Sequence, residues 1–308
     1  INKIINCGSN PNKGSIFFKK GDVRDKEFLR DIFEEFKRSG KPIESVIHFA
    51  GLKAVSESII HPLKYWDMNI NCTLSLLSVM EEFHCRNLIF SSSATVYKSE
   101  MTLDKKFTEE SSLSPINPYG NTKLTIEKIL SDLSESKPNS WRIGKLRYFN
   151  PVGAHKSGYI GEDPKQTPNN LLPVLLKVVN KEKNLLSIFG KDWPTKDGTC
   201  IRDFIHVMDL AEAHFSALQF LLSNDPQNIS LNIGTGKGTS VLEFIETFIN
   251  TNKCSLPYEF ADRRAGDSPY SVADNKKALN LLNWRPIRCI KEICEDAWNW
   301  NNTNIREG

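Results

Sequence analysis

The segments Phe90-Ser91-Ser92-Ser93 and Pro118-Tyr119-Gly120-Asn121-Thr122-Lys123 decide the predicted fold, because the first ends a strand and the second begins a helix. Pro118 suits the first turn of a helix, where its missing N–H would have no partner in any case. Tyr119 and Lys123 are four residues apart, so both side chains lie on one face of that helix. The sequence therefore predicts a seryl strand end near a helix that carries a phenol and an ammonium.

These three groups suggest acid–base chemistry at neutral pH. A free phenol has a pKa of about 10, and a neighbouring ammonium favours the phenolate and lowers that pKa. Ser93 would supply a second hydrogen bond to the same substrate oxygen. With seven Tyr in the chain, one chance Y-x-x-x-K is unremarkable. The alternative is a surface helix whose Tyr packs its ring while its Lys is solvated, and these residues alone leave it open.

Composition excludes several classes of partner. The chain has 308 residues, enough for one large or two modest domains. Its 40 basic and 37 acidic residues nearly balance, which argues against nucleic-acid binding. Seven dispersed Cys without C-x-x-C argue against a disulfide framework or a metal site and fit a reducing cytoplasm. No apolar run approaches the ~20 residues that cross a bilayer, so no membrane partner is expected.

The apolar spacing predicts alternating strands and helices along most of the chain. Buried strands are predicted at residues 15–19, 45–49, 87–92 and 142–149, with later strands at 185–189, 203–207 and 230–233. Helices are predicted at residues 25–39, 61–83, 118–130, 170–179 and 209–222. Gly234-x-Gly236 imitates a dinucleotide-binding loop, but Thr239 replaces the third Gly. We interpret it as a turn between sheet and helix.

A series of short motifs runs through nearly the whole chain in a fixed order. The motifs occupy residues 21–25, 48–55, 90–97, 119–123, 147–154, 169–173, 188–190, 197–207, 232–236 and 263–267. In this order they resemble the extended short-chain dehydrogenase/reductase superfamily and, within it, the UDP-glucose 4-epimerase family of NAD-dependent epimerases and dehydratases. The resemblance implies an α/β fold: a doubly wound, Rossmann-like parallel sheet with a smaller mixed α/β substrate domain.

The resemblance also implies a division into two domains. Residues 1–150 would form the NAD-binding domain, with 203–240 returning to it, and residues 151–308 would form the UDP-sugar-binding domain. The family's phosphate-binding G-x-G-x-x-G lies in the first βαβ unit, and the chain shows none near Ile1. We expect that the chain begins just after that unit. The first strand is central in the order 3-2-1-4-5-6, so this segment alone is expected to fold poorly and hold NAD weakly.

The implied activity is inversion of C4 in a UDP-hexose through a 4-keto intermediate, with bound NAD, as in galactose metabolism. Tyr119 would accept and return the proton, Lys123 would modulate its pKa and bind the cofactor ribose, and Ser93 would hydrogen-bond O4. A 4,6-dehydratase needs an acidic pair where this chain has Ala94-Thr95. A decarboxylase, or a binding module without turnover, remains a further alternative.

Family positions supply two sets of candidate site residues. The cofactor set is Asp22, Val23, Phe49, Ala50, Gly51, Leu52, Lys53, Tyr119, Lys123 and Phe149. The substrate set is Ser93, Asn150, Asn170, Leu171, Ser187, Ile188, Phe189, Arg202, Arg264, Asp267 and Ser271.

Some of these positions have ordinary explanations. Arg202 and Arg264 suit two adjacent phosphates, because a guanidinium donates two N–H groups at once. Either could instead form a surface salt bridge, with Asp203 or Asp262 respectively, and Lys53 could be a solvated loop residue. The family also commonly has Asn where this chain has Met68, next to Asn69, so one cofactor contact is in doubt.

The resemblance further bears on specificity and assembly. Ser271 matches a gate beside the hexose C2 substituent, and its small size predicts tolerance for UDP-N-acetylhexosamines. A loop shift by one residue would place the large Tyr270 there instead. Relatives commonly form homodimers through paired helices, so a homodimer is expected.

Overall fold

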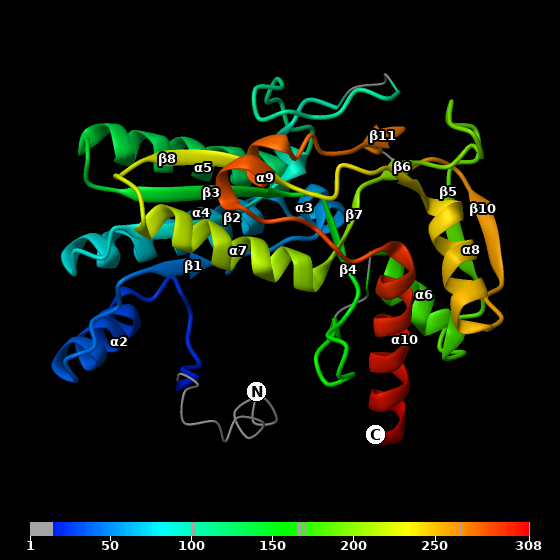
Figure 1. Ribbon diagram of the computed structural model, residues 1–308, viewed down its shortest axis with the longest axis horizontal. Coiled ribbons are helices and arrows are strands. Elements are labelled where there is room, and N and C mark those ends of the chain that lie inside the picture. The colour runs from blue at the N-terminus through cyan, green and yellow to red at the C-terminus, as the bar shows by residue number, and fades with distance from the viewer. Residues whose placement is uncertain (1–14, 100–102, 165–167, 169, 265, 308) are drawn as a thin grey trace.

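The computed structural model describes residues 15–99, 103–164, 168, 170–264 and 266–307, and its centre is a four-stranded parallel sheet (Figure 1). The strand order is β1 (Val46–His48), β2 (Asn87–Ser93), β3 (Arg142–Tyr148) and β8 (Asn228–Ile233). Because all four strands are parallel, their carboxyl ends lie at one edge of the sheet. Ser92 and Ser93 therefore lie beside their register partners Arg147 and Tyr148 at this edge.

Helices cover both faces of this sheet (Figure 1). These helices are α2 (Lys26–Arg38), α3 (Val55–Ile60), α4 (Pro62–Glu82), α5 (Pro118–Ser136), α7 (Val207–Leu222) and α9 (Lys276–Leu282). Phe90 of β2 packs in a core with residues of α2, α4 and α5, whereas Ile89 packs in a second core with α7 and α9. Adjacent strand side chains point to opposite faces, so one strand serves both cores. The predicted α/β class is confirmed.

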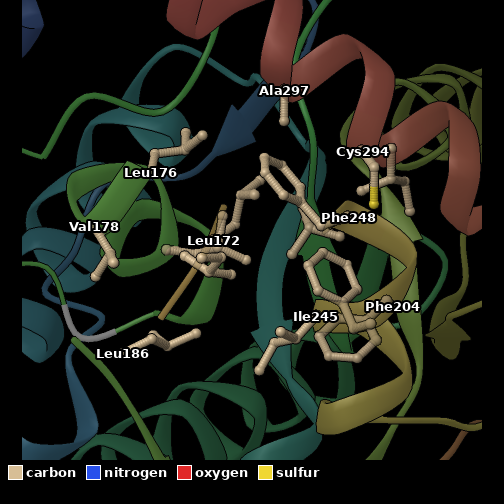
Figure 2. Close-up of a cluster of buried hydrophobic side chains, with 14 of the residues drawn as sticks. Leu172, Leu176, Val178, Leu186, Phe204, Ile245, Phe248, Cys294 and Ala297 are labelled. Atoms are coloured by element: carbon tan, nitrogen blue, oxygen red, sulfur yellow. The ribbon is translucent and has the colours of Figure 1, made fainter. Parts of the chain in front are cut away.

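A second lobe contains the remaining helices and small sheets, on the right of Figure 1. Its elements are β4 (Asn150–Val152), α6 (Leu171–Val179), β5 (Leu186–Phe189), β6 (Ile201–Arg202), β7 (Phe204–His206), β9 (Thr239–Ser240), α8 (Val241–Asn252), β10 (Tyr258–Ala261), β11 (Tyr270–Ser271) and α10 (Ile290–Glu307). Figure 2 shows its core, where Leu172 and Leu176 of α6 meet Phe248 of α8 and Ala297 of α10. Two small sheets belong to this lobe: β4 pairs with β7, and β6 pairs with both β9 and β11.

Residues 15–19 are not the buried strand that their apolar composition predicts. Ile16, Phe17 and Phe18 are 57%, 64% and 60% exposed, and no strand is assigned there. A strand needs a hydrogen-bonding neighbour, and β1 has only β2 as a neighbour among the residues described. The prediction is wrong because apolar composition supplies no backbone partner. β1 is likewise less buried than expected, since Ile47 is 37% exposed.

The helix predictions are confirmed, because their end signals were local. Asp25 caps α2 by accepting a hydrogen bond from the Phe28 N–H. Asn117 caps α5 by accepting one from the Gly120 N–H, and Pro118 occupies the first turn. Residues 234–236 form the predicted turn between β8 and the elements that follow it. No helix in the described part of the chain is long and apolar enough to cross a lipid bilayer.

Candidate active site

The structure brings Ser93, Tyr119 and Lys123 together at the carboxyl end of β2. Tyr119 is 9% exposed and Lys123 is 4% exposed, although both lie in the first two turns of α5. The Lys123 Nζ lies 5.9 Å from the centre of the Tyr119 ring and donates a hydrogen bond to the Ser91 carbonyl at 2.7 Å. The Ser93 hydroxyl lies near the Tyr119 phenol and acts to lower the pKa of that phenol. The alternative of a surface helix with a solvated lysine is therefore wrong.

The electrostatics of this pair differ from expectation. Burial raises the pKa of Tyr119, and the nearby Ser93 hydroxyl acts against that rise. Burial also lowers the pKa of Lys123 from 10.5 to about 8. The prediction that Lys123 lowers the pKa of Tyr119 is wrong for this structure. The loss of solvation of the phenolate outweighs an ammonium that faces the backbone of β2.

Asn69 holds the loop after β1 against α5, a role that sequence analysis missed. It is 2% exposed; its Oδ1 accepts from the Leu52 N–H at 2.7 Å, and its Nδ2 donates to the Leu52 carbonyl at 3.1 Å and to Thr122 Oγ1 at 2.9 Å. A Cβ on Gly51 would lie 3.1 Å from this Oδ1, so the close approach favours glycine. The available signal was that Asn69 lies at a buried position within the apolar pattern of α4.

The other predicted cofactor residues lie along the same edge. Ala50 joins Gly51 and Leu52 in the loop after β1, and Phe49 before it is 59% exposed. Asp22 and the half-buried Val23 lie in the turn before α2, where Asp22 binds Arg24. Phe149, after β3, is 8% exposed and packs in a small core with Ala273.

The donor set at this edge fits NAD. Lys123 donates one hydrogen bond within the described residues, and an ammonium has three N–H donors, so two remain for ribose hydroxyls. Lys53 presents a second cation whose side chain is 71% exposed and whose Nζ lies 3.0 Å from Glu162 Oε1. Phe49, which follows β1, offers an exposed apolar ring whose centre lies 4.9 Å from that of the His214 ring. These three side chains, with the backbone at Gly51, would hold the cofactor.

Arg202, Asp267 and Ser271 form one group in the second lobe. Arg202 Nη1 donates to the carbonyls of Ile201 and Ser268, both at 2.9 Å, and Nη2 lies 3.6 Å from Asp267 Oδ1. Ser271 is the register partner of Arg202, so their side chains share a face of the small sheet. Tyr270 is 8% exposed and its ring lies beside Gly238, on the opposite face.

Asp203 does not pair with Arg202, which removes that alternative. It is fully buried, and its carboxylate accepts hydrogen bonds from Thr235, Gly236 and Ala273. Its backbone N–H donates to the Ser271 carbonyl, and its own carbonyl accepts from the Asn150 N–H, both at 3.0 Å. Asp203 thus fixes two predicted substrate residues against the loop after β8, a role that sequence analysis missed.

The remaining substrate candidates surround β5 and α6. The Arg264 guanidinium lies 3.7 Å above the centre of the Phe189 ring, so Arg264 stacks on an aromatic face rather than pairing with Asp262. Ser187 and Phe189 are half-buried, but Ile188 is 1% exposed, and its side chain packs in the core of the second lobe. Asn170 precedes the half-buried Leu171 at the start of α6, and its Nδ2 donates to Glu162 Oε1 at 3.3 Å.

A parallel α/β sheet with a Ser-Tyr-Lys group at its carboxyl edge defines the class of short-chain dehydrogenase/reductase enzymes, which bind a nicotinamide cofactor at that edge. Comparison of the sequence with those of known families identifies one family within this class. The chain belongs to the NAD dependent epimerase/dehydratase family, whose sequence pattern matches residues 4–234.

Individual relatives resemble the chain over almost its whole length. UDP-glucose 4-epimerase 2 of Arabidopsis thaliana is 48% identical over 301 residues, which is 97% of this chain and 82% of the relative. The crystal structure of UDP-glucose 4-epimerase from Bifidobacterium longum, in complex with NAD+ and UDP, matches with a TM-score of 0.87 and 42% identity over 94% of this chain and 84% of that one. The enzyme from Stenotrophomonas maltophila, with bound NAD and formylated UDP-arabinopyranose, matches with a TM-score of 0.88 and 41% identity over the same shares.

Proposed function

We propose that this protein is an isomerase that interconverts UDP-glucose and UDP-galactose by inverting C4, with NAD as its cofactor. The observation that carries the proposal is the group of Ser93 with the buried Tyr119 and Lys123 at the carboxyl edge of the sheet. Identity of 48% to a UDP-glucose 4-epimerase over 97% of the chain supports the same reaction. The protein would thereby act in galactose metabolism and in the supply of nucleotide sugars.

The chain's own residues move one proton during the reaction. Tyr119 accepts the proton of the sugar 4-hydroxyl while Ser93 hydrogen-bonds the same oxygen, and the C4–O bond becomes a carbonyl. Bound NAD supplies the acceptor for the hydride that leaves C4 and the donor when hydride returns to the opposite face. Tyr119 then gives its proton back to the new alkoxide, so no proton or hydride is lost overall.

Tyr119 needs added positive charge to act as this base. Burial raises its pKa, so the phenol is protonated at neutral pH in the structure described. Lys123, with a pKa of about 8, still carries its charge for the most part at pH 7. A positively charged nicotinamide beside the phenol would favour the phenolate further.

The second lobe would bind the UDP moiety. Arg202 and Arg264 would bind the two phosphates, and Asp267 the ribose. Ser187 and Phe189 would line the base, and Asn150, Asn170 and Leu171 the sugar. The pairing of β8 with β3 supports a domain division in which residues 203–240 rejoin the NAD-binding domain formed by residues 1–150, and residues 151–308 otherwise bind substrate.

Product analysis tests this proposal against the related chemistries. Purified enzyme is incubated with UDP-galactose, and the nucleotide sugars are separated. We expect UDP-glucose; a 4-keto-6-deoxy sugar would indicate a dehydratase, and unchanged substrate would overturn catalysis. Thr95 supports the first outcome, since its Oγ1 donates to Ser93 Oγ at 3.0 Å in a position where a dehydratase needs an acid.

We also propose that Ser271 allows UDP-N-acetylhexosamines to bind. Ser271 shares a face with Arg202, and Tyr270 is buried on the other face, which favours the smaller side chain as the gate. Turnover of UDP-GalNAc by the wild-type enzyme, and its loss in Ser271→Tyr with UDP-galactose turnover retained, is the expected result. A wild-type enzyme active on UDP-galactose alone would contradict it.

A cytoplasmic homodimer completes the proposal. The exposed apolar side chains Leu63, Trp66 and Leu74 lie along α4, at 82%, 37% and 42% exposure, and support pairing through this helix. Light scattering after size-exclusion chromatography should give twice the chain mass. Leu74→Glu should reduce it to one chain, and a wild-type monomer would end this part of the proposal.

A further inference from the structure

The catalytic face of α5 continues into the interior of the molecule. Tyr119, Lys123 and Glu127 follow one another at intervals of four residues and so form one stripe on the helix. Glu127 is 3% exposed and lies on α5, one turn beyond Lys123. A carboxylate buried this deeply must be paired or protonated.

Glu127 is paired with both strands that flank the active site. Its Oε1 accepts a hydrogen bond from Ser92 Oγ at 2.5 Å and one from Arg147 Nε at 2.9 Å, while Oε2 accepts from Arg147 Nη2 at 2.6 Å. Arg147 is also 3% exposed, and it is the register partner of Ser92. One carboxylate thus joins α5 to β2 and to β3 at the residue immediately before Ser93.

The far side of Arg147 holds the segment that follows Ser93. Its Nη1 donates to the Tyr97 hydroxyl at 3.0 Å and to the Glu109 carbonyl at 3.1 Å. The Tyr97 hydroxyl donates in turn to Asn232 Oδ1 on β8 at 2.6 Å. Tyr97 ends the short helix η1 (Ala94–Val96), which Ser93 itself caps. The network therefore holds the chain on both sides of Ser93.

We propose that Ser92, Glu127 and Arg147 position the catalytic strand end against the catalytic helix. The inference rests on the proposed function, because it assigns these residues to the Ser93–Tyr119 contact. A buried ion pair adds little stability compared with apolar side chains of similar volume, so stability alone gives no reason for charges here. The need to hold Ser93 in place does explain the buried charges, because reaction rates in enzyme sites are sensitive to shifts of about 1 Å.

If the network of Ser92, Glu127 and Arg147 positions Ser93, disrupting it should change the pKa of Tyr119, whereas a purely structural role predicts no such change. Among the residues described, the titratable groups around the Tyr119 phenol are Lys123 on its own helix, Tyr65 on α4 and Tyr148 on β3. Ser93 is the neighbouring group that acts to lower the pKa of that phenol. If Ser93 moves away, the pKa of Tyr119 rises, and the acid limb of the kcat–pH profile moves to higher pH.

The test compares two serines along the boundary between α5 and the sheet. Ser92→Ala removes the hydrogen bond to Glu127 and leaves the Glu127–Arg147 pair intact. Ser131→Ala is the matched control, because Ser131 Oγ donates to the Glu127 carbonyl and accepts from Lys145 Nζ at 3.2 Å, twelve residues beyond Tyr119. Both variants are assayed for UDP-galactose turnover over a range of pH, and their urea unfolding is followed.

We expect Ser92→Ala to lower kcat on the order of tenfold, with KM for UDP-galactose changed less than twofold and the acid limb shifted upward. Ser131→Ala should leave kcat and the acid limb unchanged, at a similar loss of stability. Equal kcat in the two variants would overturn the proposal. So would a lower kcat in Ser92→Ala with an unshifted acid limb, since that result indicates a structural role alone. An inactive wild-type enzyme would instead refute the proposed function.

Discussion

The two groups of site residues differ in how the rest of the molecule holds them. Tyr119 and Lys123 are 9% and 4% exposed, and their helix is joined to the sheet by a buried ion pair. Phe49 is 59% exposed, and the side chain of Lys53 is 71% exposed. The groups assigned to proton transfer are therefore fixed and desolvated before substrate arrives. Phe49 and Lys53, which are assigned to cofactor binding, lie in water, where a ligand can replace their present partners.

The largest expected effect is on chemistry at the buried group. Tyr119→Phe keeps the packed ring and removes the proton acceptor, so kcat should fall by a factor of about 10²–10⁴. KM for UDP-galactose should change little, because binding of the UDP moiety is assigned to the second lobe. Steady-state kinetics of the two proteins measure both values. A variant that retains a tenth of wild-type kcat would show that another group moves the proton.

The next largest effect is on stability and concerns the buried ion pair of Arg147 and Glu127, which joins α5 to the sheet. Arg147→Leu leaves the Glu127 carboxylate buried without its partner, and the free energy of unfolding should fall by about 3–5 kcal/mol. Exchanging both Arg147 and Glu127 for Leu removes the unpaired charge and should be less destabilising than the single exchange. Urea unfolding measures both. A double variant less stable than the single one would contradict the account of the pair.

A smaller effect follows from the pKa of Lys123. Its pKa is about 8 in the folded protein, below its ordinary value of 10.5, because burial disfavours the charged form. Between these two pH values the unfolded chain binds a proton that the folded chain does not, so stability should rise with pH across this window. Below pH 8 the full cost of burying the charge is present.

Lys123→Met provides the comparison for this pH dependence. The difference in unfolding free energy between wild type and Lys123→Met, measured without added cofactor, should change by up to about 3 kcal/mol between pH 8 and pH 10.5. The change should favour the wild type as pH rises. A flat difference would mean that the ammonium is solvated, and the contrast between buried and exposed groups would fail at its central residue.

Sequence analysis was most successful where structure is determined locally. The spacing of Tyr119 and Lys123, with Pro118 before them, was enough to predict α5 and its shared face, and the structure confirms both. Residues 15–19 were predicted wrongly, because a strand depends on a partner that composition does not specify. The direction of the Tyr119 pKa was also wrong, because it depends on burial, which follows from the whole fold.

The supporting contacts could not be predicted, because they join distant parts of the chain. Glu127 and Arg147 are 20 residues apart, and nothing between them indicates that a strand and a helix will place them in contact. Asp203 meets Thr235 from 32 residues away. Single-sequence patterns report periodicity and caps, whereas such contacts depend on the register of the sheet.

The smallest expected effect on stability lies at the exposed group. Lys53 pairs with Glu162, but the side chain of Lys53 is 71% exposed, and such surface pairs contribute about 0–1 kcal/mol. Lys53→Ala should therefore barely change urea unfolding, while NAD retention weakens and becomes less sensitive to salt. Lys64→Ala is the matched control, because Lys64 forms a similar surface pair with Glu57 at 2.7 Å.

Glu162→Gln extends this prediction to the partner of Lys53. If a ligand phosphate replaces Glu162 as the acceptor for Lys53, removing the competing carboxylate should leave NAD retention equal to or stronger than that of the wild type. Fluorescence titration with NAD at low and high salt distinguishes the cases. Weaker retention in Glu162→Gln would mean that Glu162 holds Lys53 in its binding position. Lys53 would then be held in place as firmly as Tyr119 and Lys123 are. The two groups would differ only in their exposure to solvent.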